Sequence, residues 1–309
     1  MNLNNPYGNY SNRSFLDGIK ESFRQGSTLT KLIYINLGVF LLVKVLGVFY
    51  FLMGADPSGS FSLIQWLSVP ADFNALLHKP WTIFTYMFLH QGFLHILFNM
   101  LWLYWFGIIF LSYLDQKKLL SIYILGGLTG AAIFMFAFNL FPVFEEAREY
   151  SIALGASASV WAVTIAAVTY APNHIMHLMF IGPVRIKYIA LFFLALDIIS
   201  IPSGNAGGHI AHLGGAFYGW LYVNQLQQGK DIASGFVALM DSFFSLFKKR
   251  SHMKVKYKST NRMSDKDYNK KKKNEQDQMN EILDKISKSG YDSLTKDEKE
   301  ILFRSSNKH

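Results

Sequence analysis

Four polar side chains with clear chemical potential lie within apolar runs of this sequence. They are His95, Asn99, Ser157 and His212. A polar group inside an apolar span is costly to bury, so such residues are functional candidates by default. A serine hydroxyl is a weak nucleophile until a base removes its proton, and histidine titrates in the range that suits this task. Ser157 and a histidine from another segment would form the smallest unit capable of nucleophilic catalysis.

This chemistry also needs hydrogen-bond donors for the negative charge that develops on an attacked carbonyl oxygen. His95 and Asn99 are four residues apart, so they share one face of a helix and both can donate towards a common point. Ser157 stands where an apolar helix is expected to begin, which leaves its backbone N–H free as a third donor. The sequence thus predicts a nucleophile, a base and an oxyanion site.

Each of these residues also has an interpretation without catalysis. A serine in a membrane helix commonly bonds back to its own helix, and a buried histidine is commonly a hydrogen-bonded packing residue. His209 and His212 could instead be a pair of metal ligands. That interpretation lacks a helical His-Glu-x-x-His motif and any nearby carboxylate ligand, so no metal site is predicted.

The elements that must position these residues are apolar segments. Of the 309 residues, 51% are hydrophobic and only 17% are charged, whereas an ordinary soluble domain has about 25% charged residues. Several apolar runs reach the length of about 20 residues that crosses a bilayer as a helix. Six transmembrane spans are expected, near residues 32–53, 81–110, 119–141, 151–171, 188–201 and 206–226. The fold class predicted is an all-α membrane protein built as a six-transmembrane-helix bundle.

The basic residues orient these spans. The net charge of +9 does not indicate nucleic-acid binding, because the surplus lies beside the spans and in the tail, as is typical of cytoplasmic flanks. Both termini are expected to be cytoplasmic, so the Ser157 end of its span faces outward. Lys44 lies inside the first span and requires a partner.

The composition changes along the chain and predicts four segments. They are a cytoplasmic N-terminal segment, 1–30; a six-helix membrane domain, 31–226; an interfacial helix and basic linker, 227–273; and a short cytoplasmic C-terminal helical segment, 274–309. The N-terminal segment is expected to contain a short amphipathic helix at 14–24, and 248–273 is expected to be disordered. In the tail, Gly290 is placed to end one helix, and Thr295 with Glu298 forms a capping box that starts another.

Other features narrow the chemistry and the compartment. The sequence contains no cysteine, which excludes disulfides, thiolate zinc sites and a cysteine nucleophile. No cofactor is predicted. The N-terminus has neither a cleavable signal peptide nor a transit-like leader, so the expected location is a bacterial inner membrane.

Three motifs together resemble the rhomboid family of intramembrane serine proteases. Residues 89–99, with Leu89-His90 and His95-Ile96-Leu97-Phe98-Asn99, resemble the second-helix motif of that family. Gly155-Ala156-Ser157-Ala158 resembles its Gly-x-Ser-Gly nucleophile motif, with Ala158 in place of the second glycine. Residues 211–219 resemble its Ala-His-x-x-Gly-x-x-x-Gly motif. The resemblance covers about residues 30–226 and includes the number and spacing of the spans.

The resemblance implies a role for each of these positions. Ser157 would be the nucleophile and His212 the base, with His95 and Asn99 supporting the oxyanion. Gly155 belongs to the nucleophile motif, and Trp161 would pack on the catalytic histidine. Gly215 and Gly219 would let the sixth span press against the fourth. No acidic third member is evident: Asp197 in the fifth span could be proposed, but a structural role near the outer interface is expected for it. The resemblance implies two-residue Ser–His catalysis.

The predicted function is therefore cleavage of transmembrane protein substrates near the outer membrane face by a Ser157–His212 dyad. The expected partners are transmembrane substrates, membrane lipid and an unknown partner of the C-terminal tail, without nucleic acid. The alternative is an inactive rhomboid-like protein that binds membrane clients without cutting them. A transporter would predict inverted repeats and more carboxylates at the midplane, and the sequence has neither.

Overall fold

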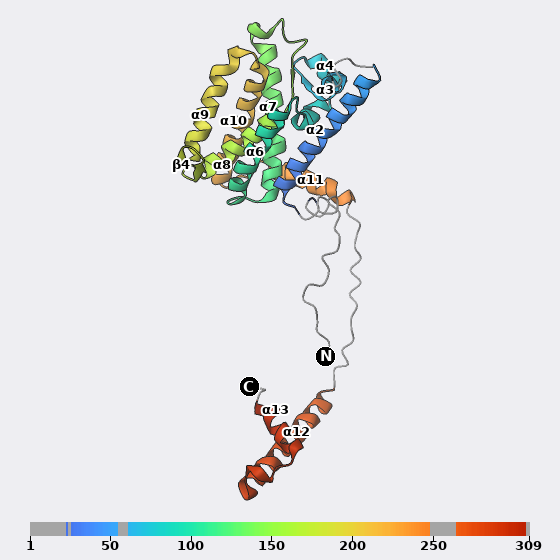
Figure 1. Cartoon of the computed structure of the whole chain (residues 1–309), viewed down its shortest axis with the longest axis vertical. Coiled ribbons are helices and arrows are strands. Elements are labelled where there is room, and N and C mark those ends of the chain that lie inside the picture. Colours follow the sequence, from blue (N-terminus) through green and yellow to red (C-terminus); the bar gives the residue numbers. More distant parts are fainter. Residues whose placement is uncertain (1–22, 24–25, 55–60, 248–263, 307–309) are drawn as a thin grey trace. The chain divides into compact units, whose positions relative to one another are not determined.

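The computed structural model of the chain describes residues 23, 26–54, 61–247 and 264–306. It is mostly helical and forms two compact units, residues 1–248 and 249–309 (Figure 1). The first unit carries all the apolar segments of the chain that were expected to span a membrane.

Each of the six expected spans contains a helix. These helices are α2 (Thr28–Leu52), α6 (Phe93–Leu111), α7 (Gln116–Leu140), α8 (Ser157–Tyr170), α9 (Ile186–Ser200) and α10 (Ala206–Gln227). Among the described residues, four helical segments are long and apolar enough to cross a membrane, namely α2, α6, α7 and α9 with the turn after it. Helix α8 has only 14 residues, and α10 is rich in small residues. The chain is an integral membrane protein, while six crossings remain a prediction.

The second span begins later than the sequence predicted. Residues 81–92 are not part of one long helix but form α5 (Thr82–Thr85), the 3₁₀ turn η1 (Tyr86–Phe88) and a loop. The backbone carbonyl of Tyr86 accepts a hydrogen bond from the N–H of Gly155 at 2.9 Å. Met87 and Leu89 are fully buried. Part of the apolar character of this stretch therefore reflects burial against other segments.

Two short antiparallel strand pairs interrupt the all-α architecture that was expected. Strand β1 (Val69–Pro70) pairs antiparallel with β2 (Ile152–Ala153), which joins the first connection to the segment before Ser157. Strand β3 (Ile175–Leu178) pairs with β4 (Gly182–Arg185) between α8 and α9. The connection before α5 also contains α3 (Phe61–Leu67) and α4 (Phe73–His78).

Helix α8 is packed between its neighbours and carries the most buried face of the unit. It contacts α10, α7 and α6, whereas α9 and α2 lie at opposite edges of the unit (Figure 1). The close packing predicted for Gly215 and Gly219 is present. A Cβ on Gly215 would overlap the carbonyl oxygen of Ala158, and one on Gly219 would overlap that of Ala162. The two glycines thus set how closely α10 approaches α8.

Contacts at one end of the unit gather the segments that carry basic residues. Lys117, in the first turn of α7, pairs with Asp241 of α11 (Ser234–Phe247) at 2.7 Å. The hydroxyl of Tyr113 bonds His174 Nδ1 at 3.0 Å, which joins the loop after α8 to the same end.

Lys44 of α2 has the partner that its position within a span required, because its ammonium group donates to the carbonyl oxygen of Gln91 at 2.8 Å.

The second unit is a helical hairpin. It contains α12 (Asp265–Ser289), the turn η4 (Tyr291–Ser293) and α13 (Lys296–Ser306), so residues 265–273 belong to a helix rather than to a linker. Gly290 ends α12, and the capping box forms, since the backbone N–H of Thr295 donates to Glu298 at 2.7 Å. Bonds from Lys285 and from that N–H lower the pKa of Glu298 to about 2. The predicted N-terminal helix at 14–24 lies outside the described residues except for Phe23, and so do residues 248–263 of the predicted disordered linker.

Candidate active site

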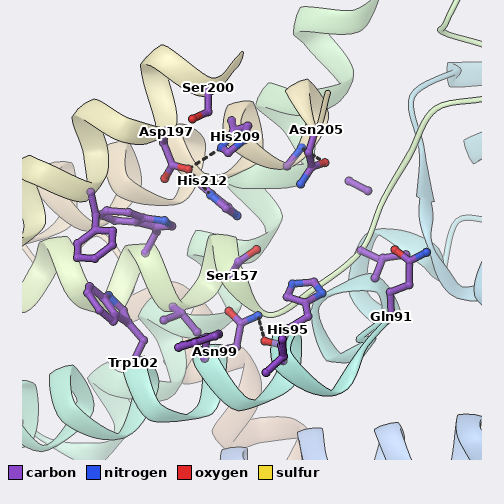
Figure 2. A pocket seen from close by; sticks show the side chains of 18 of the residues that line it. Gln91, His95, Asn99, Trp102, Ser157, Asp197, Ser200, Asn205, His209 and His212 are labelled. Atoms are coloured by element: carbon purple, nitrogen blue, oxygen red, sulfur yellow. Dashed lines mark hydrogen bonds and ion pairs between the residues drawn. The ribbon is translucent and has the colours of Figure 1, made fainter. Parts of the chain in front are cut away.

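The predicted site residues line one pocket of the membrane unit. Its volume is about 890 Å³, and Ser157, His212, His95, Asn99 and Trp161 all contribute to its wall. These residues come from α8, α10 and α6, which are far apart in the sequence but adjacent in space (Figure 2). Most of the remaining wall is apolar, so the polar groups are gathered within a hydrophobic surround.

Ser157 is the first residue of α8, and the chain before it is held in an unusual conformation. Gly155 has φ of 129°, a backbone region that side chains disfavour. A Cβ at this position would lie 3.0 Å from His95 Nε2 and 3.4 Å from Ser157 Oγ. No side chain caps the first turn of α8. Its N–H groups are therefore available at the positive end of the helix, where developing negative charge would be stabilised.

His212 reaches the pocket from α10. Its ring centroid lies 6.4 Å from that of Trp161, one turn after Ser157 on α8, at an interplanar angle of 36°. Figure 2 shows the hydroxyl of Ser157 between the ring of His212 on one side and the side chains of His95 and Asn99 on the other. Within the described part of the chain, no hydrogen bond joins Ser157 Oγ to His212. Sites without substrate often hold such groups apart and close them when substrate binds.

His95 and Asn99 lie on the pocket face of α6, as their spacing predicted. One N–H of the Asn99 amide donates to the carbonyl oxygen of His95 at 2.9 Å, which fixes the side chain against its own helix. The His95 ring meets that of His90 edge to face, with centroids 5.1 Å apart. His90 is buried behind it, and its two ring nitrogens have no hydrogen-bond partner among the described residues. The second N–H of the Asn99 amide is not used in this bond, and both Asn99 and His95 line the pocket.

Asp197 is a residue whose partners sequence reasoning missed. It lies on α9, is buried, and its Oδ1 accepts hydrogen bonds from His209 Nδ1 at 2.6 Å and from His212 Nδ1 at 3.0 Å. The expectation that no carboxylate lies near the two histidines is therefore wrong. A signal was available in the sequence, since a charged residue within a span indicates a polar partner. The partner itself follows only from the packing of α9 against α10.

These three residues also form the one group of histidine and carboxylate ligands in the described chain that could hold a cation. Their donor atoms lie within 4.8 Å of one another. The hydrogen bonds between them already satisfy both Nδ1 atoms, and the separations of 2.6 and 3.0 Å are those of hydrogen bonds.

Ala158 replaces the second glycine of the nucleophile motif, and its methyl group is accommodated by α7. A Cβ on Gly130 would lie only 2.6 Å from the Cβ of Ala158, so the absence of a side chain on Gly130 makes room for this methyl group. Ala158 is buried and does not line the pocket. The departure is thus taken up between helices rather than at the site.

Comparison with known proteins agrees with this arrangement. Residues 77–228 match the rhomboid domain family, and residues 264–308 match DUF6576, a family of unknown function. The chain is 27% identical over 158 residues to RHOMBOID-like protein 12, mitochondrial, of Arabidopsis thaliana, covering 48% of this chain and 47% of the relative. It is 29% identical over 119 residues to rhomboid protease GlpG of Pectobacterium atrosepticum, covering 38% of this chain and 37% of the relative. The chain thus matches less than half the length of either relative.

The matched region contains α6 to α10 and every residue of the pocket that the three motifs contribute. It also contains the glycines that bring α10 against α8. Residues 77–228 of this chain are therefore a rhomboid domain.

Proposed function

We propose that this protein is an intramembrane serine endopeptidase that cleaves transmembrane protein substrates near the outer face of the membrane. The observation that carries the proposal is the meeting of Ser157, His212, His95 and Asn99 in one pocket. A nucleophile, a base and two side-chain donors on three different helices are the groups that acyl transfer requires.

The arrangement suggests a sequence of proton transfers. His212 Nε2 takes the proton of the Ser157 hydroxyl as the oxygen attacks the scissile carbonyl carbon. The resulting oxyanion accepts hydrogen bonds from the backbone N–H of Ser157 and from the side chains of His95 and Asn99. His212 then gives its proton to the leaving amine, and water hydrolyses the acyl-enzyme by the same steps.

Substrate would reach the pocket from the side, beside α9. The ring of Phe193 on α9 meets that of Trp102 on α6 edge to face, with centroids 4.8 Å apart, and both residues line the pocket. This contact closes the seam between the two helices. A transmembrane helix that unwinds readily would enter by displacing it, while the loop at 202–207 acts as a movable cap over Ser157. We further propose a bacterial inner membrane as its location.

The proposal is tested with purified protein in detergent. Ser157→Ala and His212→Ala should each abolish cleavage of a single-span peptide that carries a fluorophore–quencher pair, and Ser157→Ala should abolish labelling by a fluorophosphonate probe. Ser159→Ala is the matched control, because Ser159 lies on the same helix but faces Met87 and Gly127 away from the pocket. Undiminished cleavage by either dyad variant would disprove the proposed function.

A second candidate is a rhomboid-like protein that binds membrane clients without cutting them. The observation that favours it is that no hydrogen bond joins Ser157 Oγ to His212 in the described part of the chain. Wild-type protein that retains a client peptide but neither cleaves it nor reacts with the probe would support this function instead.

A further inference from the structure

One carboxylate faces the candidate site. Asp197 is the only acidic residue among those that line the pocket, and only 8% of its surface is exposed. It comes from α9, whereas the two histidines that bond to it come from α10. The bonds therefore join two helices as well as three side chains, as Figure 2 shows.

We propose that Asp197 is a positioning residue of the active site and acts through His212, an inference that rests on the proposed function. A carboxylate oxygen only accepts, so His212 Nδ1 must carry the proton in the 3.0 Å bond to Asp197 Oδ1. The neutral ring then has Nε2 unprotonated. This is the nitrogen that faces away from Asp197 and that a base acting on Ser157 requires.

Burial makes this interaction stronger than it would be in water. Asp197 Oδ2 is buried and has no partner among the described residues, so the two imidazoles supply all the side-chain hydrogen bonds that the carboxylate receives there. When His212 takes the serine proton, the new positive charge forms within 3.0 Å of this carboxylate oxygen. A charge pair in a surround of low dielectric is stabilised more than one in water.

His209 shares the same oxygen and provides a second contact to it. It lies one turn before His212, and its Nδ1 bonds Asp197 Oδ1 at 2.6 Å, so it also holds this oxygen in place. The other titratable group at the site is His95 on α6, which has no carboxylate beside it in the pocket. Asp197 thus bonds the two histidines of α10, of which His212 is the proposed base, and does not bond His95.

Three substitutions in the whole chain test this proposal. Asp197→Asn keeps the shape, but its amide can donate to Nδ1 and stabilise the other tautomer of His212. The value of kcat for the fluorophore–quencher peptide should fall by about 10²-fold or more with KM little changed, since the analogous change in a serine protease triad costs about 10⁴. Asp197→Glu restores the carboxylate and should recover a large part of kcat. His209→Gln should cost less than about tenfold, because His212 keeps its partner.

The matched control is Asp241→Asn, which makes the same chemical change in the ion pair with Lys117, outside the pocket. Its kcat should equal that of the wild type. Thermal unfolding of every variant separates loss of fold from loss of chemistry, and the rate of fluorophosphonate labelling reports activation of Ser157 without a peptide substrate.

Several outcomes would overturn the inference. A kcat for Asp197→Asn within about threefold of wild type would show that the carboxylate does not assist His212. Equal losses in His209→Gln and Asp197→Asn, or no recovery in Asp197→Glu, would indicate a structural role. Loss of wild-type activity in a chelator with recovery on adding Zn²⁺ would assign the three residues to a cation. If wild-type protein neither cleaves nor labels, the proposed function fails first and the inference fails with it.

Discussion

Individual residues determine how Ser157 is presented to the pocket. The segment before α8 turns at Gly155, where a Cβ would lie only 3.0 Å from the His95 ring. Gly155 also donates its N–H to Tyr86 O, which holds the turn in place. Ser157 and His95, the proposed nucleophile and oxyanion donor, are therefore spaced by a residue that has no side chain.

Gly155→Ala should consequently damage the site. The residue would be strained at φ of 129° and its methyl group would press on His95. We expect a loss of about 1–3 kcal/mol in unfolding free energy for the backbone strain, together with slower fluorophosphonate labelling of Ser157.

Gly229→Ala is the control for this change. Gly229 also has a positive φ, 81°, but no atom lies within 4 Å of the position of its Cβ. It should be strained without any effect on labelling. Equal labelling rates for Gly155→Ala and wild type would contradict the role assigned to this turn.

Pairs of helices determine how closely His212 approaches Ser157. His212 is brought to α8 by the face of α10 that carries Gly215 and Gly219, and each glycine lies against a backbone carbonyl of α8. A methyl group at either position cannot be absorbed by rotation of a side chain. The helices themselves must separate, which would also move His212 away from Ser157.

Gly219→Ala tests this packing at one helical turn beyond Gly215. Overpacking of this kind typically costs about 1–3 kcal/mol, which should appear as a lower unfolding temperature in detergent. Displacement of His212 by about 1 Å would lower the labelling rate by as much as about 10²-fold.

The control is Gly235→Ala in α11, where a Cβ would meet no atom within 4 Å. Alanine favours a helix over glycine by about 1 kcal/mol, so this variant should be as stable as wild type or slightly more stable. A Gly219→Ala protein as stable as Gly235→Ala would show that the two helices can separate without penalty.

At the level of the whole molecule, the membrane orientation decides from which side the site is open. The Lys117–Asp241 pair and the contact between Tyr113 and His174 gather the basic segments at one end of the membrane unit. Basic residues favour the cytoplasmic side, so the turn before α10 is expected at the opposite, outer face. The pocket extends to that turn, since Asn205 and Gly208 contribute to its wall.

Because the sequence contains no cysteine, this orientation can be measured by labelling single introduced cysteines. Ser203→Cys lies in the turn before α10, and Met179→Cys lies at the exposed tip between β3 and β4. In spheroplasts of a bacterial host, a membrane-impermeant maleimide should label Ser203→Cys, whereas Met179→Cys should react only after lysis. The reverse pattern would place the site on the cytoplasmic side. Unsubstituted protein is the blank, because it has no thiol.

The sequence by itself determined the local features whose causes are local. Apolar runs located the six helices, Thr295 and Glu298 predicted the start of α13, and Gly290 predicted the end of α12. The resemblance of the three motifs to one family singled out the four candidate residues that line the pocket. The glycines on α10 predicted its close approach to α8.

Tertiary structure alone decided the features that depend on which segments meet. The stretch 81–92 is as apolar as a span, but it folds as α5, η1 and a loop that is tied to the segment before α8 by the bond between Tyr86 and Gly155. Ala158 fits only because Gly130, on another helix, leaves room for it. Asp197 and His212 are 15 residues apart on different helices, and no local pattern relates them. Their meeting follows from the packing of α9 on α10, where burial leaves the carboxylate no partner among the described residues except the two imidazoles.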